Sequence, residues 1–354
     1  MEELKRELEK LSKTYVDTPE KEEKILIPFI KRLLELSVKE RRKLLPTIRE
    51  LQWIKGKFSE TFCDHHRARF LGAVQFVCGN KREMDLGYHI NFNLLCKLLS
   101  LYTPSWLAEY INDAESYLNF NISYEQLMQL IDMGYMQELS PKRIAQILPG
   151  YICIRSSLPK GKDTFNSDLL LKREITLKEH IWYLFEQESS IGYHNDRAQT
   201  AYKEGTTPRD ESFSAAFYRF SLDGHLDRNQ LLRATLSTFN RSFKKDMVNW
   251  FAGLFEELQP RAEELISLQE EIMQVFTSPY TKPVNVMLQQ LKKIASEGGF
   301  HYQEFIERAT TLFFSSPKNS LLTIYSIFEQ IVTGHPEMKE ACCIPLCQLF
   351  LKKD

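Results

Sequence analysis

The C-terminal half of the chain repeats one pattern of hydrophobic residues, and this repeat restricts the possible folds most. The segment from Glu263 to Pro279 is echoed 38 positions later by the segment from His301 to Pro317. Three matched pairs carry the echo, namely Leu268 with Ile306, Phe276 with Phe314 and Pro279 with Pro317. A period of about 40 residues is typical of arrays of helical hairpins of the HEAT type.

A second set of matched apolar residues follows each copy of this segment. Val284, Met287, Leu288, Leu291 and Ile294 recur 37 positions on as Leu321, Ile324, Tyr325, Phe328 and Ile331. Their spacing places them on one face of a helix, so each unit is predicted to be an outer helix, a Ser-Pro turn and an inner helix. One such pair cannot cover its own apolar face and must stack on a neighbour. The sequence therefore predicts an all-α fold, an α-α superhelix of HEAT- or ARM-like hairpins.

Interruptions of the helical hydrophobic periodicity divide the 354-residue chain into domains. We expect an N-terminal helical domain at 1–150, a connecting loop at 151–175 and C-terminal repeats at 176–354, with a polar loop at 189–211. Three capping boxes mark predicted helix starts, at Ser37 with Glu40, Ser123 with Gln126, and Thr176 with Glu179. The small apolar residues of 71–78 predict a closely packed helix, and no segment alternates as a β-strand does.

Charge and cysteine content limit the compartment and the partners. The net charge of −1 gives the whole chain no attraction to nucleic acid or to anionic membranes. The N-terminus lacks the apolar core of a signal peptide and no run is long enough to cross a bilayer, so we expect a cytoplasmic protein without membrane contact. The seven cysteines form an odd set, mostly within apolar stripes, and are expected to be small buried hydrophobes without disulfides.

Cys63, His65 and His66 are the strongest metal-ligand candidates, because cysteine and histidine are zinc ligands. Adjacent histidines point about 100° apart on a helix, however, and no CxxC or HxxxH supplies further ligands. A helix start capped by Asp64, with both histidines near solvent, is the favoured interpretation, and no metal or cofactor is predicted. Cys343 and Cys347 share a helical face, which fits packing as well as a redox or soft-metal site.

Other candidate sites are better explained by packing. The four tryptophans (Trp53, Trp106, Trp182 and Trp250) lie in helical stripes and are expected to be core residues more than recognition platforms. The paired acids at 256–257, 263–264 and 270–271 are typical of a solvated helix face. Nucleotide-binding, hydrolase and metalloprotease motifs are missing from the sequence, which disfavours the common enzyme classes.

The chain resembles a bacterial family of uncharacterised HEAT-like proteins known as a domain of unknown function. The similarity lies in 226–232 (LDRNQLL), in the helix pair with Asp246, Trp250 and Phe251, and in the turn at 258–264, with weaker matches near Cys78 and at 104–108. The resemblance implies membership of a multi-protein assembly, since similar proteins are encoded near MoxR-type ATPases, von Willebrand A-domain proteins or SWIM zinc-finger proteins. It implies no catalytic residues.

The predicted function is a non-catalytic scaffold whose inner helices line a concave surface for a protein or peptide. Exposed positions between the core residues of one inner helix, Asn285, Gln289, Lys292 and Lys293, are the expected contacts. A second set, His194, Arg197 and Arg209, lies in the predicted polar loop. The alternative is a HEAT-like nucleic-acid-binding protein or DNA glycosylase, which needs a basic concave face. Residues 246–274 carry seven acids and one base, which disfavours it.

Overall fold

The computed structural model describes residues 1–14, 18–55, 60–62, 64–113, 122–156, 161–314 and 317–351. Most of these residues lie in helices and only four short strands occur among them, so the all-α prediction is confirmed. Their contacts divide the chain into two compact units, Met1–Ile147 and Leu148–Asp354. Within the described part of the chain, no helix is both long enough and apolar enough to span a bilayer.

The first unit is a cluster of helices around α5. Its elements are α1 (Glu2–Ser12), α2 (Pro19–Leu34), α3 (Val38–Arg41), α4 (Leu45–Leu51), β1 (Trp53–Lys55), β2 (Glu60–Phe62), α5 (His65–Cys78), α6 (Phe92–Leu101), α7 (Leu107–Asn112), α8 (Tyr124–Asp132) and α9 (Pro141–Tyr151), which crosses the division. The two short strands pair antiparallel, although no segment of the sequence shows the alternation of a strand.

Helix α5 is buried along most of its length, as its small apolar residues predicted. Ala68 and all residues from Phe70 to Cys78 are buried, with α2 and α4 packed against them. A Cβ at Gly72 would lie 2.8 Å from the backbone oxygen of Leu86, so only glycine fits this close approach. A hydrogen bond holds the two segments together here, because the backbone N–H of Leu86 donates to the side-chain oxygen of buried Gln75 at 3.1 Å.

Two of the three predicted capping boxes form. Ser37 with Glu40 starts α3, and Ser123 with Gln126 starts α8. The third prediction is wrong, because Thr176 is fully buried inside α10 (Glu174–Lys178) and the residue before that helix is Arg173. A threonine whose side chain packs in the interior does not cap the start of a helix. The spacing between a threonine and an acidic residue is the same in both cases, so the sequence alone cannot tell a capping threonine from a buried one.

The second unit continues from the end of α9 and is a series of helical hairpins. Its elements are β3 (Cys153–Ile154), β4 (Thr164–Phe165), α10, α11 (Tyr183–Glu186), α12 (Ile191–Lys203), α13 (Phe213–Leu222), α14 (Arg228–Ser237), α15 (Lys245–Glu257), α16 (Ala262–Gln274), α17 (Thr281–Ile294), α18 (Tyr302–Thr310), α19 (Lys318–Gly334) and α20 (Lys339–Leu351). The expected connecting loop at 151–175 is therefore not structureless, because β3 and β4 pair and a 3₁₀ helix spans Ser167–Lys172.

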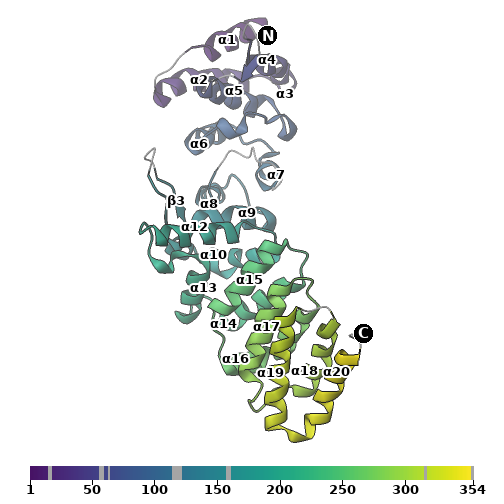
Figure 1. The fold of residues 1–354 in the computed structure, drawn as a ribbon. Coiled ribbons are helices and arrows are strands. Elements are labelled where there is room, and N and C mark those ends of the chain that lie inside the picture. Colours follow the sequence, from purple (N-terminus) through teal and green to yellow (C-terminus); the bar gives the residue numbers. More distant parts are fainter. Residues whose placement is uncertain are drawn as a thin grey trace. The chain divides into compact units, whose positions relative to one another are not determined.

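The predicted hairpin repeat is confirmed. Helices α14 and α15, α16 and α17, and α18 and α19 are paired in sequence order. Helices α15, α17 and α19 then pack side by side, and α14 packs on α16 (Figure 1). The second helix of each hairpin thus covers the apolar face that its neighbour cannot cover alone.

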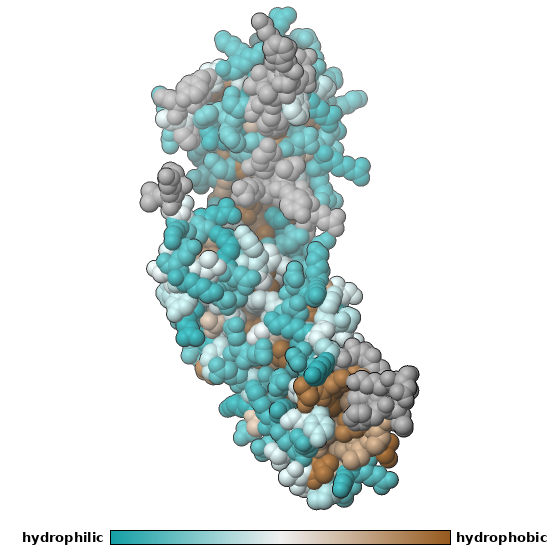
Figure 2. All heavy atoms as spheres, in the orientation of Figure 1, coloured by the Kyte–Doolittle hydropathy of each residue, from teal (hydrophilic) through white to brown (hydrophobic). Residues whose placement is uncertain are grey.

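Equivalent positions of α17 and α19 are equally buried in the core but differ in burial on one face. Met287, Leu291 and Ile294 are buried, and so are their partners Ile324, Phe328 and Ile331. Leu288 is fully buried, whereas its partner Tyr325 is 49% exposed, so the expected burial of Tyr325 is wrong. Helix α17 packs between α15 and α19, whereas α19 has α17 on one side and contacts α18 and α20. Figure 2 shows hydrophobic side chains gathered over these C-terminal helices.

The polar loop predicted at 189–211 is also wrong. Ile191–Lys203 forms α12, and Arg209–Glu211 forms a 3₁₀ turn before α13. The buried residues of α12 are Ile191, Asn195, Ala198 and Ala201, and all but Ile191 are small or polar. Such a set packs well against neighbouring helices but gives little hydrophobic periodicity, which is why the sequence pattern missed it.

Several residues expected in the core lie at the surface. Trp53 is 44% exposed, so the prediction of a core residue is wrong there. Trp106, Trp182 and Trp250 are half-buried against neighbouring aromatic rings, which agrees with the prediction in part. Tryptophan is large enough to reach from a packed helix to its solvent margin. Cys343 and Cys347 are exposed on α20, whereas Cys78 and Cys342 are buried. Packing therefore does not account for Cys343 and Cys347.

Candidate partner-binding groove

An open polar depression lies where α15, α17 and α19 run side by side. Its walls are Glu256 from α15, Gln289, Gln290, Lys292 and Lys293 from α17, and Gln330 from α19. Three of the four residues predicted on α17 therefore line one depression. We call the surface formed by this depression and its continuation along α15 and α17 the amide groove.

The continuation begins at the other end of α17. It is lined by Ser189, Ser190, Gly192, Tyr193 and Asp196, by Lys244, Asp246, Met247, Asn249 and Trp250, and by Lys282. Tyr193 is 62% exposed and the half-buried Trp250 forms part of the wall. Gly192 packs on this tryptophan, since a Cβ there would lie 3.5 Å from the Trp250 side chain. This end of the surface offers aromatic rings as well as charges.

The two depressions lie along the same faces of α15 and α17. Lys282, Gln289 and Lys293 are separated by seven and four residues, which places them on one face of α17. On α15 the corresponding face carries Asn249 and Glu256, again seven residues apart. Figure 2 shows a mainly hydrophilic surface over α15 and α17, in contrast to the C-terminal helices.

Unsatisfied amide groups occur at both ends of the groove. The side-chain oxygens of Asn249 and Gln330 are buried and accept no hydrogen bond within the described residues. A buried acceptor without a partner costs roughly 1–3 kcal/mol. Gln289 donates to Thr323 at 2.9 Å and Lys293 donates to Gln290 at 2.7 Å, which holds these side chains in place.

Asn285 differs from the other predicted contacts on α17. Its side-chain oxygen accepts a hydrogen bond from the hydroxyl of Ser320, which is buried on α19. It does not line the depression formed by Gln289, Lys292 and Lys293. Asn285 therefore joins two neighbouring hairpins.

His194 and Arg197 lie on α12 and are engaged inside the second unit. The Arg197 guanidinium pairs with Asp163 and lies 5.6 Å from the Tyr193 ring and 5.7 Å from the Phe165 ring. Burial, together with the charges of Arg197 and Arg155, lowers the pKa of His194 to about 4, so His194 is neutral at physiological pH. Arg209 is exposed in the turn before α13 and does not line the amide groove.

The weak metal candidates are not brought together into a described site. Cys63 lies outside the described residues. His65 and His66 are exposed at the start of α5, where Asp64 accepts from the backbone N–H of Arg67 at 2.9 Å. The capped helix start that the sequence favoured is therefore confirmed.

A second polar surface involves α11 and α14. It is lined by Trp182, Phe185, Glu186, Asp227, Asn229, Gln230, Arg233, Ala234, Ser237 and Arg241. Arg233 pairs with Glu271 of α16 there, so its charge is balanced within the fold. The amide groove differs in having unbonded buried acceptors.

The fold and this groove define an all-α helical-repeat protein with an open, amide-lined surface on one layer of its hairpins. Comparison of the sequence with known families identifies the particular group. The chain belongs to the family described as a domain of unknown function, DUF6493, whose match spans residues 2–319. The curated proteins and the solved structures contain no match to the chain.

Proposed function

We propose that the protein is a non-catalytic, HEAT-like scaffold that binds an extended peptide segment of a partner protein in the amide groove. The observation that carries this proposal is the open polar depression shared by three successive inner helices, with Glu256 from α15, Gln289 and Lys293 from α17 and Gln330 from α19. The backbone of an extended peptide presents N–H donors and C=O acceptors at regular intervals along its length. Such a segment can bond to the polar side chains that line the depression.

The charges and rings of the groove favour a particular kind of peptide. Lys292 and Lys293 face Glu256 across the depression at one end, so the cations outnumber the acid there. Trp250 and Tyr193 lie at the other end, and both residue types are common in interface hot spots. The fitting peptide has a carboxylate side chain near the lysines and an apolar or aromatic side chain near the tryptophan.

The same charges disfavour the nucleic-acid alternative. The lysines that line the groove (Lys244, Lys282, Lys292 and Lys293) are accompanied by the acids Asp196, Asp246 and Glu256. A phosphate backbone needs a continuous positive track, because each phosphate carries a charge. Duplex DNA is therefore expected to bind weakly even at low salt.

Selection from a displayed library of random peptides tests the proposal on the full chain. The enriched peptides are synthesised with a fluorophore, and their affinity is measured by anisotropy. We expect Lys293→Glu to weaken binding by about tenfold or more, because the substitution turns an attraction to a peptide carboxylate into a repulsion. Trp250→Ala is expected to weaken binding by a similar factor.

Lys318→Glu is the matched control for this measurement. Lys318 is exposed at the start of α19, at the opposite end of that helix from Gln330, and its substitution makes the same charge change. Binding is expected to be unchanged in this variant. Peptides that bind both lysine variants alike, a failure to enrich any peptide, or tighter binding of duplex DNA at the groove would each contradict the proposal.

A further inference from the structure

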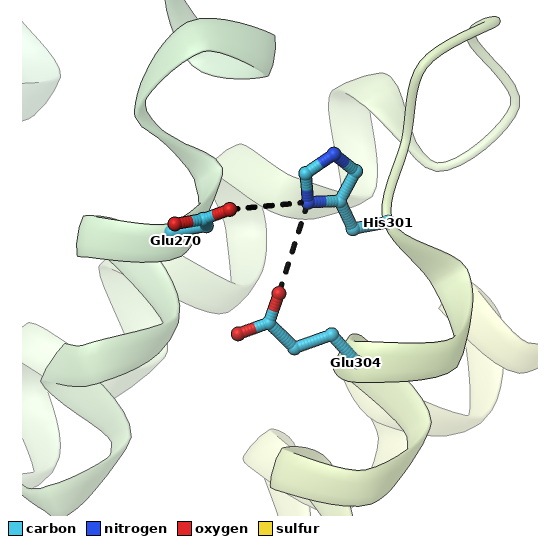
Figure 3. Close-up of side chains that lie close together, drawn as sticks. All are labelled: Glu270, His301 and Glu304. Carbon is cyan, nitrogen blue, oxygen red and sulfur yellow. Dashed lines mark ion pairs between the residues drawn. The ribbon is translucent and has the colours of Figure 1, made fainter.

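A cluster of metal-ligating side chains lies on the other helices of the repeat, apart from the amide groove. Glu270 of α16, His301 just before α18 and Glu304 in the first turn of α18 each direct one ligand atom toward the others (Figure 3). The three atoms lie within 4.8 Å of one another. This is the one group of three such side chains among the residues that the structure describes.

The distances between the three ligand atoms fit a cation bound among them better than hydrogen bonds between the side chains. The Nδ1 atom of His301 is 3.7 Å from Glu270 Oε1 and 3.7 Å from Glu304 Oε2, too far for hydrogen bonds. Metal–ligand bonds of about 2.0–2.1 Å in a tetrahedral site put neighbouring ligand atoms about 3.3 Å apart. Small rotations of the side chains would close the difference.

The cluster is held in place by residues around it. Buried Gln269 accepts from the backbone N–H of His301 at 2.7 Å and donates to the backbone oxygen of Gly299 at 2.9 Å. Gly299 has a φ of +100°, a conformation that glycine adopts readily. Arg308 donates to Glu304 Oε1 at 2.8 Å, which leaves Oε2 facing the histidine. Bonds of this kind orient metal ligands in known sites.

We propose that Glu270, His301 and Glu304 bind one divalent transition-metal ion, with Zn²⁺ as the representative species. One imidazole and two carboxylates supply a ligand set that zinc accepts in proteins. His301 is 48% exposed and Glu270 61% exposed, so an ion has free access and water completes its coordination. Because the ligands come from α16 and α18, the ion joins two successive hairpins.

Zinc titration of the full chain tests this site, with binding measured against a chromogenic chelator. The thiols of Cys343 and Cys347 are exposed, and thiolates are zinc ligands, so the background carries Cys343→Ser and Cys347→Ser to remove this competing chemistry. We expect one equivalent of Zn²⁺ to bind in this background. His301→Gln and Glu270→Gln should each weaken it by at least about tenfold, since each removes one of three ligands.

Glu307→Gln is the control, because Glu307 is an exposed acid on α18 outside the cluster. This variant should bind zinc with unchanged affinity. Zinc should also raise the melting temperature of the background protein and of Glu307→Gln, but not of His301→Gln, because the ion binds only the folded pair of helices. No saturable zinc binding by the background protein, or His301→Gln and Glu270→Gln variants that bind zinc as tightly as the background protein does, would overturn the proposal.

Discussion

At the scale of single residues, Arg228 connects two segments that are far apart in the sequence. Its guanidinium donates to Glu264 at 2.6 and 3.1 Å and to the backbone oxygen of Leu258 at 2.8 Å. It also donates to the hydroxyl of Ser221 on α13 at 3.2 Å. The segments 226–232 and 258–264, which carry the family resemblance, are thus joined by one side chain.

Replacing Arg228 should destabilise the second unit. The Arg228 and Glu264 side chains are only 15% and 16% exposed, so Arg228→Ala leaves a carboxylate and a backbone oxygen largely out of water. We expect a loss of about 2–4 kcal/mol in the free energy of unfolding, measured by urea denaturation. Arg233→Ala is the control, because Arg233 is 46% exposed in its pair with Glu271 and should cost less than about 1 kcal/mol. Equal losses in both variants would contradict this account of Arg228.

The same ion pair predicts a pH dependence. Burial alone would raise the pKa of Glu264, but hydrogen bonds from Arg228 and Arg261 outweigh it and lower the pKa from 4.5 to about 2. A carboxyl group whose pKa is lower in the folded state than in the unfolded state stabilises the fold at pH values above its unfolded-state pKa. This stabilisation is lost as the pH falls toward the folded-state pKa. The stability difference between wild type and Glu264→Gln should therefore shrink between pH 4.5 and pH 2. A difference that stays constant over this range in urea denaturation would show that the pair does not act in this way.

At the scale of helices, the sequence specified the hairpins because their two apolar stripes repeat in the same order. The match of Met287 with Ile324 and of Leu291 with Phe328 reflects one packing position used twice. Periodicity could not show that Tyr325 is exposed, since exposure depends on how the neighbouring helices pack. It also missed α12, whose buried residues Asn195, Ala198 and Ala201 are small or polar.

The matched positions 288 and 325 allow a direct test of this packing. Leu288→Ala removes a fully buried side chain between α17 and its neighbours, and we expect it to cost about 2–5 kcal/mol. Tyr325→Ala removes a half-exposed side chain at the equivalent position of α19, and should cost about 1 kcal/mol or less. Denaturant unfolding of the two variants measures both. Comparable losses would mean that the two hairpins are packed differently from this description.

At the scale of the whole molecule, the sequence predicted the all-α class and part of the candidate groove. Gln289, Lys292 and Lys293 were identified because they lie between the apolar positions of a repeated helix. Asn249, Trp250 and Gln330 were missed, because the groove they complete needs three hairpins in register. The signal that could have found Asn249 was its seven-residue spacing to Glu256 on the exposed face of α15.

The face of the repeat formed by α15, α17 and α19 is the proposed binding site for a partner. The most direct measurement is photo-crosslinking in native cells from a benzophenone amino acid placed at Gln289, with Glu307 on α18 as the control position. We expect a discrete adduct from position 289 that Lys293→Glu abolishes, and no such adduct from position 307. The same adducts from both positions, or an adduct from 289 that survives Lys293→Glu, would contradict the claim.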